Sequence, residues 1–275
     1  MIVHPSLNLC PMVKLSYLPP EHKIQAQIRK ELFVKGINCP KCSKRYNYKI
    51  NDRYYCKKCR YKFSLKAMLP FKASKLSMTQ LWLLLHCFLK QLSFQDTMYI
   101  TELSHVTIRR WFRKFSNLIP EQKLKLCGIV EMDEAFIGRR RFNNQTIVLG
   151  AVEKTTGKTV LEVARNRETG SLDRFILRNI ERGSMVQTDG YAGYEHITEF
   201  FGYGHQSENH SAWELGMTNH AENRWMRLRR FIRKVYHHIW KEHLKRILKE
   251  FQARISHPEA FTNQLSFLSF VFQVS

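Results

Sequence analysis

The 275-residue sequence lacks any run of 18 apolar residues, and it lacks a charged N-terminal stretch followed by a short apolar segment. The first absence excludes a membrane-spanning helix and the second a secretory signal peptide, so we expect no membrane partner. Two N-x-S/T sequons, at Asn144 and Asn209, are then chance matches. We expect the protein in the cytoplasm or nucleoid of a prokaryote, or in the nucleus of a eukaryote.

Acidic residues are also few. The sequence has 23 Asp and Glu against 45 Lys and Arg, which gives a formal net charge of +22. A polyanion is the natural partner of such a chain, because cations that neutralise phosphates release condensed counterions. The basic residues run through the whole chain, which favours nucleic acid over a membrane surface. A hydrophobic content of 44% is enough for a folded core.

The number of cysteines is odd, and four of the seven form two C-x-x-C pairs: Cys39, Cys42, Cys56 and Cys59. Zinc takes four soft ligands in a tetrahedron, and each C-x-x-C turn presents two thiolates on one side. The residues between the pairs indicate an aromatic-rich hairpin with a turn at Asn51-Asp52. Redox-active thiols are the alternative, but two pairs flanking one hairpin are more typical of a zinc ribbon.

Three helices are expected between Lys75 and Leu118, in "MTQLWLLLHCFLK", "SFQDTMYIT" with Ser93 as its N-cap, and "SHVTIRRWFRKFSNLI". Apolar residues recur with helical period in the third helix and leave four cations on its free face: Arg109, Arg110, Arg113 and Lys114. Two short helices joined by a tight turn, the second of them basic, indicate a helix-turn-helix that reads the major groove. A solvated helical face is the alternative, and the neighbouring zinc ribbon favours DNA contact.

From Leu126 onward the pattern changes to strands, in "LCGIVEMDEAFIG", "QTIVLGAVEK" and "KTVLEVARN". An amphipathic helix, a fourth strand in "SMVQTDGYAGY" and a long helix from about Asn219 follow. This order predicts an α/β domain on a mixed sheet. In the long helix, Trp225 and Leu228 begin an apolar stripe, and basic residues off that stripe are expected to follow a DNA backbone: Arg224, Arg227, Arg230 and Lys234.

Three acids are candidates for a metal site. Strand alternation puts Glu131 and Asp133 on one face of the first strand and Glu134 on the other. Asp189 ends a different strand, and Glu222 lies in the first turn of the long helix. Acids from separate elements can converge to hold two magnesium ions, roughly 3.5–4 Å apart, for phosphodiester chemistry. Taken singly, Asp189 also fits a turn residue and Glu222 an ordinary helix start.

The motifs "CPKC", "CKKC", "VEMDEAFIG", "TDGYAGY", "TNHAENRWMRLRR" and "VYHHIWKEHLKRILKEF" occur in this order between Cys39 and Arg254. In this order they resemble the zinc-ribbon DDE transposases of the insertion-sequence group related to eukaryotic Merlin elements. The resemblance implies a ribonuclease H-like fold. It also implies magnesium- or manganese-dependent hydrolysis at the transposon end and strand transfer by the liberated 3′-hydroxyl.

Carried over by motif, the catalytic acids are Asp133, Asp189 and Glu222, and Asn219 is the alternative for the third position. Arg229 stands where the family often has Lys, two helical turns after Glu222, and can still reach a phosphate. Other residues expected at the DNA are Arg139 and Arg140, just past the first strand, and Arg230. Glu131 would support Asp133 from the same face.

The sequence thus predicts five segments. They are an arm (1–35), a zinc ribbon (36–66), a helix-turn-helix domain (74–118), a ribonuclease H-like catalytic domain (124–256) and a C-terminal tail (257–275). The expected partners are the terminal inverted repeats and target DNA, with a homo-oligomer assembled on DNA. Two alternatives stay open: a catalytically inactive, domesticated DNA-binding relative, and a ribonuclease H-like nuclease acting on RNA or on a junction.

Overall fold

The computed structural model describes residues 18–45, 47–71, 74–138, 145–189, 202–208 and 219–273. The chain forms two compact units, the first holding residues up to Leu118 and from Thr262 onward, and the second Ile119–Phe261. Among the described helices, none is both long and apolar enough to cross a membrane. The division into five segments stays a prediction, and we describe each unit by itself.

The predicted hairpin between the cysteine pairs is confirmed in the first unit. Strand β1 (Asn47–Ile50) pairs antiparallel with β2 (Arg53–Cys56), and the turn at Asn51-Asp52 joins them. Asn51 has φ +53°, a left-handed conformation that Asn tolerates better than most residues. A third strand, β3 (Lys62–Ser64), pairs with β2 and leads into the short helix α2 (Leu65–Met68).

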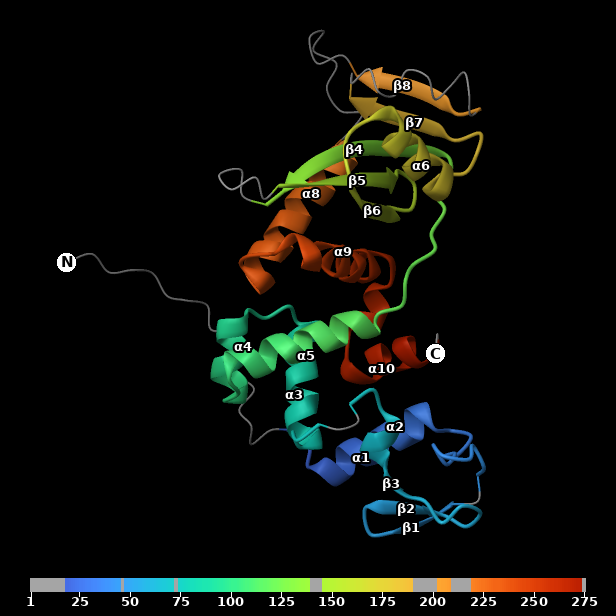
Figure 1. Ribbon diagram of the computed structural model, residues 1–275, viewed down its shortest axis with the longest axis vertical. Helices are drawn as coiled ribbons and strands as arrows, with labels where there is room; N and C mark the ends of the chain where they lie inside the picture. The colour runs from blue at the N-terminus through green and yellow to red at the C-terminus, as the bar shows by residue number, and fades with distance from the viewer. Residues whose placement is uncertain are drawn as a thin grey trace, which may run out of the picture. The chain divides into compact units, whose positions relative to one another are not determined.

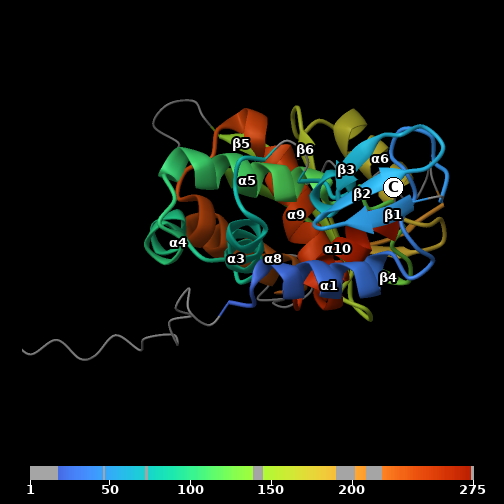
Figure 2. The same cartoon turned by 90° about the horizontal axis from the view of Figure 1, so that it is seen from below.

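The three helices predicted between Lys75 and Leu118 are present as α3 (Met78–Leu89), α4 (Phe94–Thr101) and α5 (His105–Leu118). Ser93 caps α4 as predicted, because its side chain accepts a hydrogen bond from the Asp96 N–H. The first unit also holds α1 (Glu21–Leu32) and, in the C-terminal segment, α10 (Gln264–Gln273). Helix α10 packs on α1 and α3, with Phe267 edge-on to Phe88, and runs beside α1 in Figure 2.

The second unit is built on a five-stranded sheet with the order β6-β5-β4-β7-β8. Its strands are β4 (Ile129–Ile137), β5 (Thr146–Glu153), β6 (Thr159–Ala164), β7 (Met185–Asp189) and β8 (Gly204–Glu208). β5 runs antiparallel to β4 and β6, whereas β7 runs parallel to β4 and β8. This mixed sheet, which carries helices and follows the cysteine hairpin, confirms the predicted α/β fold. Strand β8 was not predicted.

Side chains alternate along β4 between a face buried in an apolar core and a face that carries Glu131 and Asp133. Val130 and Met132 are fully buried in a core shared with α6 (Thr169–Asn179). Residues on the other face meet α8 (Asn219–Phe231), and α9 (Lys241–Ser256) packs on β6. Figure 1 shows α8 and α9 beneath the sheet. Glu131 and Asp133 of β4 therefore meet a helix that begins at Asn219.

The single long terminal helix expected from the sequence is divided in the structure. After α8 comes a π-helical segment, Ile232–Tyr236, and His237 then takes a positive φ of +55° before α9 begins at Lys241. The hydroxyl of Tyr236 donates to Oε2 of the fully buried Glu250 on α9, at 2.5 Å. This buried hydrogen bond joins the bend to α9. Its two residues are 14 positions apart, so the helical period of the sequence does not reveal it.

Candidate active site and zinc centre

The four cysteines of the two C-x-x-C pairs come together in the first unit. Their sulfur atoms all lie within 4.8 Å of one another, with 3.5 Å between Cys39 and Cys59 and 3.5 Å between Cys42 and Cys56. Zinc–sulfur bonds of about 2.3 Å in a tetrahedron require sulfur atoms about 3.8 Å apart. The cluster therefore fits one zinc ion, as the sequence predicts.

Both cysteine pairs sit on the same kind of turn. The N–H of Ser43 donates to the carbonyl of Cys39 at 2.8 Å, and that of Arg60 to the carbonyl of Cys56 at 2.9 Å. Ser43 and Arg60 both have φ +58°. A hydrogen bond from the Cys59 backbone is the main cause that lowers the pKa of Cys56 to about 7, which favours the thiolate that binds metal.

Asp133 and Asp189 lie on two adjacent parallel strands, Asp133 in the middle of β4 and Asp189 at the end of β7. The last paired residues of β4 and β7 are Glu131 and Gln187, and each aspartate lies two residues further along its strand. Because side chains alternate along a strand, both aspartates emerge on the face that α8 covers. The Oδ1 atom of Asp189 is buried and has no hydrogen-bond partner in the described part of the chain.

Burial and neighbouring charges disfavour the ionised form of the Asp133 carboxyl group. Burial is the main cause that raises its pKa to about 6, and the charges of Glu134 and Asp189 raise it further. Hydrogen bonds from the Glu134 N–H at 2.7 Å and from the Trp225 indole N–H at 2.8 Å act in the opposite direction. Two acids that repel each other in a half-buried place, one with an unpaired oxygen, fit a bound divalent cation.

Glu131 contacts the N-terminus of α8, a partner that the sequence did not specify. It is fully buried, and its Oε2 accepts the backbone N–H groups of His220 at 2.7 Å and Ala221 at 3.0 Å. Its Oε1 lies 3.2 Å from the Lys154 ammonium and 2.8 Å from His220 Nδ1. A carboxylate at a helix N-terminus satisfies free N–H groups and the helix dipole. Glu131 therefore anchors the start of α8, the helix that carries Trp225.

Glu222 lies in the first turn of α8 with its side chain exposed. Among the described residues, the four cysteines are the group of three or more potential metal ligands whose atoms lie within 4.8 Å of one another. Glu222 thus does not join Asp133 and Asp189 at that distance. The structure brings two of the three predicted acids together, and the third position stays a prediction for Glu222 or Asn219.

Trp225 reaches Asp133 only because residue 150 is glycine. Gly150 on β5 is paired with Asp133, and a Cβ atom built on it would lie 2.5 Å from the Trp225 ring. A real Cβ contact this short does not occur, so any side chain there must displace the indole. The requirement is invisible in the sequence, because Gly150 and Trp225 are 75 positions apart.

Gly150→Ala is expected to lower the free energy of unfolding by about 1–3 kcal/mol, the usual cost of overpacking a core. It should also loosen the Asp133 carboxylate by moving its indole donor. Gly170→Ala is the matched control, since Gly170 lies in α6 with open space around it and Ala is the better helix former. Urea denaturation of both variants checks the difference, and equal stabilities would contradict this packing.

The basic residues predicted at DNA are distributed over both units. Arg109, Arg110 and Arg113 are exposed on α5, opposite the buried Ile108, Trp111, Phe112 and Phe115. Lys114 is instead half-buried, with its ammonium 4.4 Å from the centre of the Trp111 ring. The aromatic face attracts the cation and holds it on the helix.

In the second unit, Arg229 and Arg230 are exposed on α8, as expected for phosphate contact. Arg224 is instead held by the protein, since its guanidinium donates to the Gly157 carbonyl and the Thr159 hydroxyl, both at 3.0 Å. It therefore fastens α8 to the turn between β5 and β6. Arg139 and Arg140 lie outside the described residues.

Comparison with known proteins identifies the second unit. The family model of the ISXO2-like transposase domain matches residues 125–255. A search of curated proteins found no match. This family match confirms the resemblance to a transposase family.

Similar solved structures come from retroviral proteins. A chain of the simian T-cell lymphotropic virus intasome in complex with PP2A regulatory subunit B56 gamma is 11% identical, with 64% of this chain and 68% of that chain covered and a TM-score of 0.37. The HTLV-2 integrase catalytic core domain in complex with magnesium is 8% identical, with 54% and 98% covered and a TM-score of 0.35. For the BIV integrase catalytic core domain the identity is 14%, the coverage 46% and 81%, and the TM-score 0.32. Over residues 125–255, the compact unit that contains Asp133, Asp189 and α8 therefore matches the model of the ISXO2-like transposase domain.

Proposed function

We propose that this protein is a DNA transposase that cleaves phosphodiester bonds at transposon ends and joins the liberated 3′-hydroxyl to target DNA. The observation that carries the proposal is the pair of aspartates, Asp133 and Asp189, each two residues beyond the last paired residue of the adjacent parallel strands β4 and β7, within the segment that matches a transposase domain. Their mutual repulsion and the unpaired oxygen of Asp189 support a divalent cation at this place.

Asp133 and Asp189 would hold magnesium or manganese, with Glu222 or Asn219 supplying a further ligand from the first turn of α8. Bound cations of this kind supply Lewis-acid stabilisation of the phosphate charge and activation of the attacking oxygen. Trp225 keeps one oxygen of Asp133 in place through its indole N–H. Glu131 holds the N-terminus of α8 against the sheet, and so fixes both Trp225 and Glu222.

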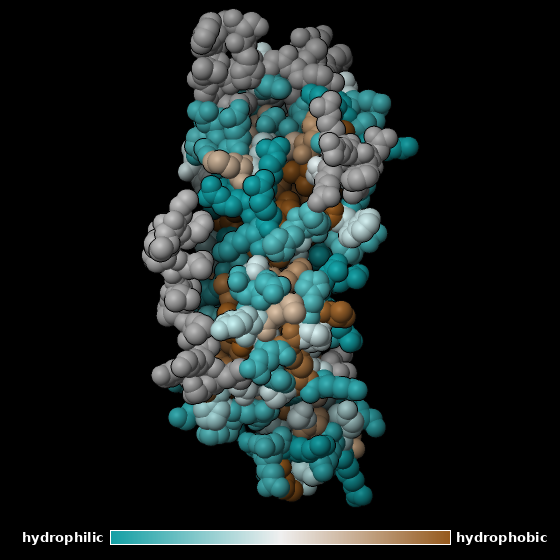
Figure 3. All heavy atoms as spheres, turned by 90° about the vertical axis from the view of Figure 1, so that its left-hand side faces the viewer, coloured by the Kyte–Doolittle hydropathy of each residue, from teal (hydrophilic) through white to brown (hydrophobic). Residues whose placement is uncertain are grey.

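DNA binding would be shared among the zinc ribbon, the basic face of α5 and the arginines of α8. Arg109, Arg110 and Arg113 lie on the exposed side of α5, where a helix-turn-helix reads the major groove. Hydrophilic side chains cover most of the face drawn in Figure 3, which suits a polyanionic partner for a chain of net charge +22. We include in the proposal a homo-oligomer assembled on the terminal repeats.

The test is a cleavage assay on duplex DNA taken from the two ends of the genetic element that encodes the protein. Nicks at the element's ends are expected with magnesium or manganese and none in buffer that contains neither metal, because the aspartate pair needs a cation to act. Competition with RNA duplex and RNA–DNA hybrid distinguishes a ribonuclease H-like nuclease. Cleavage that persists without either metal, or that prefers RNA, would refute the proposed function.

A further inference from the structure

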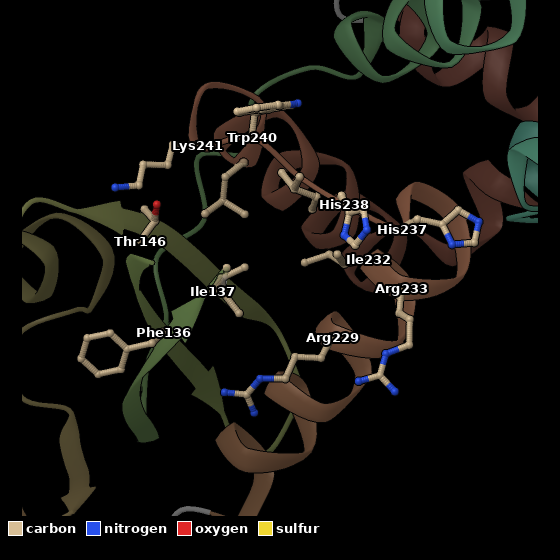
Figure 4. A pocket seen from close by; sticks show the side chains of 13 residues that line it. Phe136, Ile137, Thr146, Arg229, Ile232, Arg233, His237, His238, Trp240 and Lys241 are labelled. Atoms are coloured by element: carbon tan, nitrogen blue, oxygen red, sulfur yellow. The ribbon is translucent and has the colours of Figure 1, made fainter. Parts of the chain in front are cut away.

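A pocket of about 700 Å³ lies between the end of β4, the start of β5 and the bend from α8 to α9. Ile137 and Ile232 form its apolar interior, with Trp240 and Lys241 at one edge and Arg229 and Arg233 at the opposite edge of the view in Figure 4. This volume lies in the range of pockets that bind small molecules or single nucleotides.

The charge of the pocket is of one sign. Its lining includes Arg229, Arg233 and Lys241 and no Asp or Glu. Within the described residues, Arg229 and Arg233 make no ion pair, and both are exposed. Lys241 is the first residue of α9, where the helix dipole disfavours a cation. Arg229 and Arg233, which no acid of the lining balances, indicate an anionic occupant.

Aromatic surface accompanies this charge. Trp240 is 63% exposed at the mouth of the pocket, and Phe136 is 42% exposed on its β4 side. Large exposed aromatic side chains beside arginines are what a protein uses to stack nucleic-acid bases while neutralising the phosphates that join them. An anion without an aromatic ring would use the cations but leave the Trp240 surface unexplained.

The pocket also continues the elements that carry the aspartate pair. Phe136 and Ile137 lie three and four residues beyond Asp133 on β4, and Arg229 lies one helical turn beyond Trp225 on α8. A DNA strand with a phosphate at Asp133 would therefore have its next nucleotides near the pocket. Bases inside a duplex are already stacked on their neighbours, so a base placed on Trp240 has to be unpaired.

We propose that this pocket binds an unpaired nucleotide of the DNA strand next to the phosphate held at Asp133 and Asp189, with the base on Trp240 and the backbone phosphates at Arg229 and Arg233. This inference rests on the proposed function, which it makes more specific: the substrate of the site is a DNA end with a locally single-stranded stretch. The pocket then selects frayed or overhanging ends over continuous duplex.

The experiment compares two DNAs with the full chain in buffer without magnesium or manganese, so that no cleavage is needed and the zinc stays bound. One is a 20-base-pair blunt duplex, and the other is the same duplex with a three-nucleotide 3′ overhang containing 2-aminopurine. The overhang should bind about tenfold tighter, since one stacked base contributes about that much, and its 2-aminopurine fluorescence should be quenched. Trp240→Ala should abolish both effects and leave blunt-duplex affinity unchanged, whereas Trp240→Phe should retain most of them.

Arg233→Gln tests the phosphate contact separately. It should reduce the slope of log affinity against log salt by about 0.7 for the overhang DNA, the value for one contact to a single strand, without removing the quenching. A slope and an affinity equal to those of the unsubstituted protein would contradict a phosphate at Arg233.

Several outcomes overturn the proposal. Equal binding of both DNAs, or an equal loss for both with Trp240→Ala, would mean that the pocket does not select unpaired nucleotides. If Trp240→Ala lowers the molar mass in light scattering while the overhang preference persists, the pocket is a contact between two copies of the chain. Metal-dependent end cleavage without overhang preference would refute only the binding of an unpaired nucleotide in the pocket. Overhang preference without any cleavage would refute only the proposed transposase function.

Discussion

Asp133→Asn is expected to lower the rate of DNA cleavage by on the order of a thousandfold while the protein stays folded. A metal ligand contributes several kcal/mol to the stabilisation of transition-state charge, and each 1.36 kcal/mol is about a factor of ten in rate. Asn has nearly the same shape as Asp, and its carbonyl can accept one of the two N–H groups that Asp133 binds, those of Trp225 and Glu134. The amide NH2 then faces the other N–H, so we expect the loss of one hydrogen bond without a change of fold. Single-turnover cleavage in magnesium measures the effect.

Binding of the cation provides a second readout for the same variant. In buffer without magnesium or manganese, Asp133→Asn loses one hydrogen bond but also a half-buried charge that Glu134 and Asp189 repel, so we expect its stability to stay within about 1 kcal/mol of that of the unsubstituted protein. Added magnesium should raise the melting temperature of the unsubstituted protein and not that of the variant, since only a bound ligand stabilises. Glu181→Gln, at an exposed acid outside the pair, is the matched control and should behave as unsubstituted. Undiminished cleavage by folded Asp133→Asn would exclude this carboxylate from the chemistry.

Removal of zinc is expected to unfold the cysteine hairpin and to abolish its share of DNA binding. Structural zinc in small cysteine-rich motifs contributes about 10–16 kcal/mol of apparent binding free energy, far more than three short strands gain from their own packing. We expect one zinc ion for each chain, lost on substitution of Cys42→Ser or Cys56→Ser. Hydrogen exchange should then become fast in β1, β2 and β3 and stay slow in the sheet of the second unit.

Cys127→Ser is the control for this experiment. Cys127 is an exposed cysteine outside the cluster, so its replacement should leave both the zinc content and the exchange pattern unchanged. Metal analysis by mass spectrometry and exchange of the hairpin amides decide the outcome together. A hairpin that stays protected after loss of the metal would mean that aromatic packing, such as the Tyr48–Tyr55 stack, is sufficient by itself.

The elements that sequence pattern predicts well are those with strong local signals. The cysteine hairpin, α4 with its Ser93 cap, and the buried stripe of α5 depend on spacing and period within about 15 residues. β8 and the bend after α8 were missed for the opposite reason. β8 is held by parallel pairing to β7, and the bend by the Tyr236–Glu250 bond, so the partner of each lies on another element.

The residues of the candidate site also differ in how much of their surroundings the sequence predicts. Asp133 and Asp189 are recognisable as acids on strands, because alternation can be read from residues nearby in sequence. That Glu131 anchors α8 and that Arg224 is bonded to Gly157 depends on contacts with other elements. Lys114 lies on Trp111 of the same helix, a local contact at a spacing of three residues that was interpreted from the sequence as a free cation at the DNA.

Sequence by itself predicted the class of this protein: a basic chain with a four-cysteine cluster, a mixed α/β domain that resembles transposases, and two acids on adjacent strands. Only tertiary structure decided that Trp225 crosses Gly150 to reach Asp133, and that Trp240, Arg229 and Arg233 border one pocket. The physical reason is that periodicity specifies which face of an element a residue occupies. Which residue of another element meets that face depends on how the whole domain packs.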